Sequence, residues 1–126
     1  MITTKILTNL SVTQTNGSHS ITADVSQKLG GGGSALNPHE LLEASLGACT
    51  TITVMMYAKR KQWPLTDVVT TVKILSENGE VNEISRKIEL KGDLTDVHRE
   101  RLLEIANKCP MHNFLQKKSH IETSLG

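Results

Sequence analysis

The chain has few aromatic residues, with one Tyr, one Trp and one Phe among 126 residues. Its core must therefore come from Leu, Ile, Val, Met and Ala, and a core of that kind often gains from a subunit partner. An excess of one charge is also missing, because 14 Lys and Arg stand against 13 Asp and Glu. Without a basic stripe, no nucleic-acid partner is expected.

Long apolar runs are scarce as well. Residues 1–10 mix Lys5 and threonines with isolated apolar residues, unlike a signal peptide. No other segment is expected to reach membrane-spanning length, so no membrane partner is expected. The length suits a single domain over residues 1–126. We expect a cytoplasmic protein whose two cysteines are reactive or buried thiols and not a permanent disulfide.

Strand patterns occur in two pairs. Residues 3–14 and 18–26 alternate around Asn16-Gly17, which predicts a hairpin with a tight turn. Four glycines at 30–33 predict a loop. The alternating segments 65–75 and 81–90 predict a second hairpin, and residues 119–125 a closing strand.

The first helix signal is the sequence Asn37-Pro38-His39-Glu40, with a cap residue, proline at the first helical position and a carboxylate that returns to the cap. The helix should run to about Lys61 and is apolar on most sides, which predicts that it is buried. Residues 95–108 predict an amphipathic helix, with a short helical turn at 111–117 after Pro110. Hairpins separated by helices indicate the α+β class, with antiparallel strands and a long buried central helix.

The two cysteines, Cys49 and Cys109, lie on core-facing stripes of different predicted helices. Cys49 by itself is equally explained as a small buried hydrophobic residue. If the helices pack together, the thiols could form a reversible disulfide. Cys109 is expected at the end of its helix, where the dipole disfavours a thiolate, so Cys49 is the better nucleophile and Cys109 the better resolving cysteine.

Glu40 is a third candidate site residue, although the capping box alone would account for it. Nine residues of helix place it about 13 Å along the axis from Cys49 and on the opposite side. If Glu40 acts on a thiol, that thiol should belong to a partner chain, which would place the active site at a dimer interface.

The sequence disfavours a zinc site and a phosphate-binding loop. Cys109 and His112 have the spacing of half a zinc site, but Cys49 has no neighbouring ligand and His112 is expected on a solvated turn. The glycine run before a helix resembles a phosphate loop, yet the Lys-Ser/Thr pair of such loops is missing. No metal and no other cofactor is therefore predicted.

Four segments together resemble the osmotically inducible protein C and organic hydroperoxide resistance (OsmC/Ohr) family, in its OsmC-like branch. They are Asn37-Pro-His-Glu-Leu-Leu42, Leu46-Gly-Ala-Cys-Thr50, Met56-Tyr-Ala-Lys-Arg-Lys61 and Asn107-Lys-Cys-Pro-Met-His112. The resemblance implies an OsmC-like fold and an intertwined homodimer with two active sites at the subunit interface.

The resemblance also implies a thiol peroxidase. Cys49 would attack an organic hydroperoxide and become a sulfenic acid, Cys109 would resolve it to a disulfide, and Glu40 would help organise the site. A dithiol, in Ohr members a lipoyl protein, would be the reductant. Better-characterised members have the glutamate ten residues before the first cysteine, where this chain has His39.

Those members also use an arginine from the N-terminal strands, whereas this chain has no arginine before Arg60. Lys28 and Arg86 are the candidate replacements. Because a thiol of pKa about 8.5 needs a nearby cation or donors to ionise at neutral pH, a second function stays open. It is a non-catalytic dimeric module that binds an apolar small molecule in the same pocket.

Overall fold

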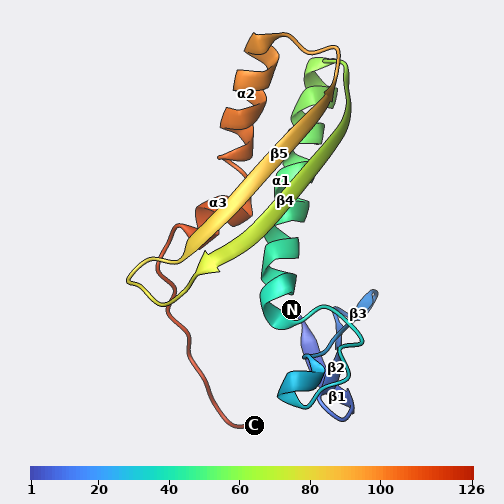
Figure 1. Ribbon diagram of the computed structural model, residues 1–126. Coiled ribbons are helices and arrows are strands. Elements are labelled where there is room, and N and C mark those ends of the chain that lie inside the picture. The colour runs from blue at the N-terminus through green and yellow to red at the C-terminus, as the bar shows by residue number, and fades with distance from the viewer. The chain divides into compact units, whose positions relative to one another are not determined.

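The computed structural model describes the whole chain, Met1–Gly126, which divides into two compact units, Met1–Ala44 and Ser45–Gly126 (Figure 1). The single-domain expectation stays a prediction.

The first unit holds a three-stranded antiparallel sheet in the order β1-β2-β3, with β1 at Thr3–Thr8, β2 at Ser11–Thr15 and β3 at Ser20–Ala23. The predicted Asn16-Gly17 turn joins β2 to β3, and Gly17 has a φ of 99°. The expected single strand over residues 3–14 was wrong. Asn9, with a φ of 52°, reverses the chain and separates β1 from β2, because Asn tolerates the left-handed conformation that a tight turn requires.

The predicted glycine loop is built around the buried Asp24 carboxylate. This carboxylate accepts hydrogen bonds from the Ser34 hydroxyl at 2.7 Å and from the Val25 amide at 2.8 Å. The Ser34 hydroxyl, followed by the Val25 amide, holds the pKa of Asp24 below its ordinary value. A Cβ at Gly31 would lie 2.2 Å from the Val25 carbonyl oxygen, so glycine is required there. A short 3-10 helix, η1 at Gln27–Leu29, precedes the glycines.

Helix α1, Pro38–Lys61, begins at the predicted cap. Asn37 Oδ1 accepts the Glu40 amide proton at 2.9 Å, and Glu40 Oε1 accepts the Asn37 amide proton at 3.2 Å. The helix ends with three cations in its last turn, and Gln62 follows with a φ of 57°. Both ends therefore follow from local sequence signals.

The expectation that α1 is buried nearly all round does not hold within this chain. Its buried residues form one row at four-residue spacing: Leu46, Thr50, Val54 and Ala58. On another face Ile52 and Met56 are 57% and 65% exposed.

The expectation that no segment reaches membrane-spanning length was also wrong, since α1 has 24 residues and an 18-residue window of mean hydropathy 1.3. Core helices of soluble proteins meet the same criterion.

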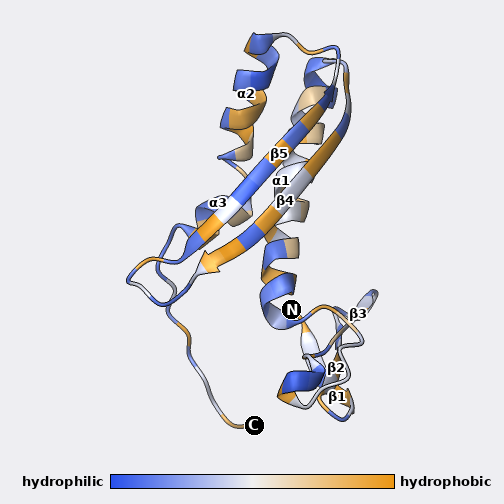
Figure 2. Ribbon diagram, viewed as in Figure 1, coloured by the Kyte–Doolittle hydropathy of each residue, from blue (hydrophilic) through white to orange (hydrophobic).

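The second unit contains the antiparallel hairpin of β4, Leu65–Ser76, and β5, Glu83–Gly92, as predicted. Partly buried and exposed residues alternate along most of both strands, and hydrophobic residues recur along them (Figure 2). The inward face packs against α1 and α2, Asp96–Ala106, which lie on the same side of the hairpin (Figure 1). The fully or largely buried core consists of Val54, Ala58, Leu65, Val68, Leu102 and Ala106.

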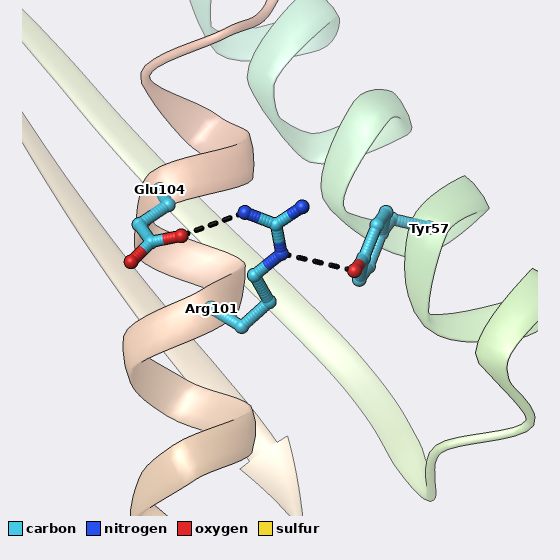
Figure 3. A network of polar contacts seen from close by, with 3 residues as sticks. All are labelled: Tyr57, Arg101 and Glu104. Carbon is cyan, nitrogen blue, oxygen red and sulfur yellow. Dashed lines mark hydrogen bonds and ion pairs between the residues drawn. The ribbon is translucent and has the colours of Figure 1, made fainter.

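A polar network joins α2 to α1 (Figure 3). Arg101 Nε donates to the Tyr57 hydroxyl oxygen at 3.0 Å, and Arg101 Nη1 lies 2.7 Å from Glu104 Oε2. The hydrogen bond from Arg101, aided by nearby cationic charge, lowers the pKa of Tyr57. This arginine therefore has a carboxylate counter-ion and a hydroxyl acceptor.

Helix α3, Pro110–Leu115, follows α2 after a short break. The predicted closing strand over residues 119–125 was wrong, because this segment has no regular structure and its residues are exposed. A strand needs a sheet edge to satisfy its backbone groups, and no strand of either sheet pairs with this segment.

Candidate functional site

The fold brings together the two predicted site cysteines, which lie 60 positions apart in the sequence. Cys49 lies in the middle of α1 and Cys109 immediately before α3. Both are free thiols; Cys109 is fully buried and Cys49 is half-buried. The Cys49 side chain is within hydrogen-bonding reach of the Cys109 thiol. The proximity on which a reversible disulfide depends is therefore present in the reduced protein.

Cys109 lies at the start of a helix and not at the end of one. Helix α2 ends at Ala106, and Cys109 is the N-cap residue of α3. Its sulfur accepts the His112 amide proton at 3.3 Å. The argument that a helix C-terminus disfavours a thiolate at Cys109 was therefore wrong, because Pro110 begins a new helix whose free amide points at the sulfur.

Arg86 on β5 is the cation next to this thiol. Its Nη1 donates to Thr50 Oγ1 at 3.0 Å and toward Cys109 Sγ at 3.9 Å. Its Nη2 donates to Asn107 Oδ1 at 2.7 Å and lies 3.2 Å from His112 Nδ1. One guanidinium group thus connects β5 with α1, with the end of α2 and with α3.

Opposing effects act on the ionisation of Cys109. Burial raises its pKa and is the largest single influence. Hydrogen bonds from the His112 amide, from Thr50 and from Cys49, together with the charge of Arg86, act in the opposite direction. Their combined effect lowers the pKa of Cys109 below its ordinary value.

His112 is half-buried beside Arg86, so the expectation of a solvated turn was wrong. Burial, followed by the charge of Arg86, lowers the pKa of His112. Since a guanidinium can only donate, His112 Nδ1 is the acceptor and Nε2 carries the proton. No group of three or more His, Cys, Asp or Glu residues is arranged to hold a metal ion.

Glu40, the third predicted site residue, lies in the first turn of α1 within the first unit. Its carboxylate is exposed and closes the capping box on Asn37. The capping role is therefore present in the structure. A role for Glu40 at a thiol stays a prediction.

The sequence contained a signal for Arg86 that motif comparison did not use. The inward-facing positions of β5 are Ile84, Arg86, Ile88 and Leu90, so a single charged residue interrupts an apolar row. A charged residue at an inward position of a strand needs buried partners. Thr50 and Asn107 had no such signal, since each becomes evident only as a hydrogen-bond partner of Arg86.

The chain matches the family model described as OsmC-like protein over residues 31–124. A search of curated proteins finds no match. Among solved structures, the OsmC-like protein of Mycoplasma pneumoniae is 21% identical with a TM-score of 0.79, covering 92% of this chain and 86% of that one.

Two structures of organic hydroperoxide resistance proteins are also similar. The protein from Legionella pneumophila is 25% identical with a TM-score of 0.68, covering 92% of this chain and 88% of that one. The protein from Elizabethkingia anophelis, with bound thiocyanate, is 24% identical with a TM-score of 0.61, covering 90% and 84%. The predicted α+β fold with a long central helix is therefore confirmed, and the chain belongs to the OsmC-like family.

Proposed function

We propose that this protein is a thiol peroxidase that reduces organic hydroperoxides through Cys49 and Cys109. The observation that carries the proposal is the meeting of two free thiols, one half-buried and one fully buried, beside a cation. Cys49, the more accessible thiol, attacks the peroxide and becomes a sulfenic acid. Cys109 then closes the disulfide before further oxidation, and a dithiol, such as a lipoyl protein, restores both thiols.

The alternative of a non-catalytic module that binds an apolar small molecule is less well supported. It was based on the lack of an arginine before Arg60. Arg86 now supplies a guanidinium 3.9 Å from the Cys109 sulfur. A half-buried cation beside a buried thiol favours a thiolate, which a purely apolar binding pocket would not need.

We further propose a homodimer with its active sites at the subunit interface. The exposed stripe of α1, formed by Ala44, Ala48, Ile52 and Met56, repeats every four residues and matches the spacing of a helix-packing face. A second copy of α1 would cover this stripe and would bring its Glu40 to the cysteine pair.

The Arg86 guanidinium, which bonds Thr50 near the middle of α1, disfavours a lipid environment for this helix, because a charge is costly in lipid. We place the protein in the cytoplasm, where thiols are kept reduced.

The proposal is tested by consumption of cumene hydroperoxide and of hydrogen peroxide with a dithiol as reductant. We expect the organic peroxide to be preferred, because bulky apolar substrates suit a site in a Leu- and Met-rich helix. Cys49→Ser should abolish turnover, whereas Cys109→Ser should give a single turnover followed by overoxidation of Cys49. The double variant supplies the blank rate. Full activity in both single variants would rule the proposal out.

A further inference from the structure

We infer that Arg86 is the positioning residue that keeps Cys109 as a thiolate, so that the resolving cysteine of the pair is held ready to attack. This inference rests on the proposed peroxidase function and concerns its second step, the formation of the disulfide between Cys49 and Cys109. Arg86 occupies an inward position of β5, between Ile84 and Ile88 along the strand and opposite Val72 on β4.

A guanidinium in such surroundings loses hydration and needs both acceptors and a compensating charge. Its acceptors are present, since the four contacts to Thr50, Cys109, Asn107 and His112 use both terminal nitrogens. None of these partners is a carboxylate. Three ion pairs of the same unit involve other cations: Lys87–Glu89, Lys91–Asp67 and Arg101–Glu104.

The group among these partners that can become an anion near neutral pH is the Cys109 thiol. The titratable and charged groups facing it are Cys49 from α1, Arg86 from β5 and His112 from α3. His112 is held neutral by its lowered pKa and contributes a backbone N–H to the sulfur. Arg86 is therefore the one full positive charge in the cluster, and the thiolate is its counter-ion.

Burial decides which chemical step this thiolate serves. Cys109 has no exposed surface, so a bulky hydroperoxide does not reach it, whereas Cys49 is partly exposed. A poised thiolate at Cys109 instead suits attack on an oxidised Cys49 beside it. Thiol–disulfide chemistry proceeds through the thiolate, so the rate of resolution depends on the fraction of Cys109 that is ionised.

The two steps balance as follows. The Cys49 sulfur loses its thiol proton as it attacks one oxygen of the hydroperoxide, the O–O bond breaks, and the products are a Cys49 sulfenic acid and an alcohol, which takes up a proton in place of the one lost. The Cys109 thiolate then attacks the sulfenic sulfur and forms the S–S bond. Hydroxide leaves and takes up a proton from solvent to become water. The two cysteines are oxidised by two electrons in total and the peroxide is reduced by two.

The test separates ionisation from turnover. In a Cys49→Ser background, the ultraviolet absorbance of the thiolate reports Cys109 alone. We expect Arg86→Met to move its titration midpoint to higher pH, Arg86→Lys to move it less, and Arg99→Met to leave it unchanged. Arg99 is the matched control, because its exposed guanidinium bonds only the Leu90 carbonyl among the contacts described.

A second measurement follows one equivalent of cumene hydroperoxide at pH 7 in chains that keep both cysteines. We expect Arg86→Met to slow disulfide formation about tenfold or more, since an adjacent opposite charge commonly changes a thiolate population by that factor. The first oxidation of Cys49 should change much less, and sulfinic acid at Cys49 should accumulate. Asn107→Ala removes the acceptor of one N–H of Arg86 at an exposed position and should also slow disulfide formation. This variant serves if Arg86→Met does not fold.

The outcomes are distinguishable. An unmoved Cys109 titration in Arg86→Met and Asn107→Ala, or disulfide formation within twofold of the unchanged protein, overturns the inference even if peroxide is consumed. If the unchanged protein consumes no peroxide, the proposed function fails, and the titration still decides whether Arg86 holds the thiolate.

Discussion

Two arginines of the second unit contact α1, and they do so in contrasting ways. Arg101 lies on the surface side of α2, bonds the Tyr57 hydroxyl and has Glu104 as a counter-ion (Figure 3). Arg86 lies on the inward face of β5, and its described partners include no carboxylate. An arginine with a matched carboxylate stabilises the packing of its elements. An arginine whose neighbouring anion can only be a thiol is better explained by chemistry at that thiol.

A substitution in the hydrophobic core of the second unit should give the largest effect on stability. Leu102 is 1% exposed and belongs to the same buried core cluster as Val54 and Ala58. We expect Leu102→Ala to lower the free energy of unfolding by about 2–5 kcal/mol, as measured by denaturant titration. Leu103→Ala, at a position 56% exposed, is the control and should change it by less than about 0.5 kcal/mol. Equal losses would mean that the core has been placed on the wrong face of α2.

Methionine substitutions of the two arginines should separate their roles. Arg101→Met should lower the free energy of unfolding by about 0.5–1.5 kcal/mol, because it removes a hydrogen bond to Tyr57 and an exposed ion pair. Arg86→Met should change it by less than about 0.5 kcal/mol, because the loss of the hydrogen bonds to Thr50 and Asn107 is offset by the replacement of a half-buried charge with an apolar side chain in an apolar row. Thermal unfolding of both variants at one pH checks the difference. A loss in Arg86→Met as large as that in Arg101→Met would make Arg86 a structural residue.

The pH dependence of stability should show the smallest difference. The folded state lowers the pKa of Cys109 and of His112, so between each lowered pKa and its ordinary value the unfolded chain binds more protons. Stability should therefore rise with pH: the His112 contribution is lost as pH falls below about 6.5, and the Cys109 contribution as pH falls through its lowered pKa. In Arg86→Met the rise should be shallower. A steeper rise in that variant would contradict the assigned electrostatics.

Local signals predicted much of the fold. The capping box at Asn37 and Glu40, the turn at Asn16-Gly17 and the alternation of β4 and β5 each act over a few residues, and all are present. The expectations that failed depend on distant partners. The segment 119–125 has strand-like alternation but pairs with no sheet edge, and α1 is apolar on most sides although its own chain covers one face.

The candidate site also combines features that the sequence predicts with features that depend on distant partners. The two cysteines and the family motifs could be read from the sequence, and so could the candidacy of Arg86 as a replacement cation. The environment of Cys109 could not, because Pro110 can either end one helix or begin the next. In the structure it begins α3, and the His112 amide therefore reaches the sulfur.

The sequence by itself determined the helices, the hairpins, the pair of thiols and the family, because caps, turns, periodicity and motif spacing are properties of neighbouring residues. The tertiary structure alone decided that the guanidinium of β5 meets the sulfur before α3, and that the thiol beside it is the fully buried one. Charge and burial act through space over a few ångströms, and residues 23 positions apart become neighbours only when the sheet and the helices have packed.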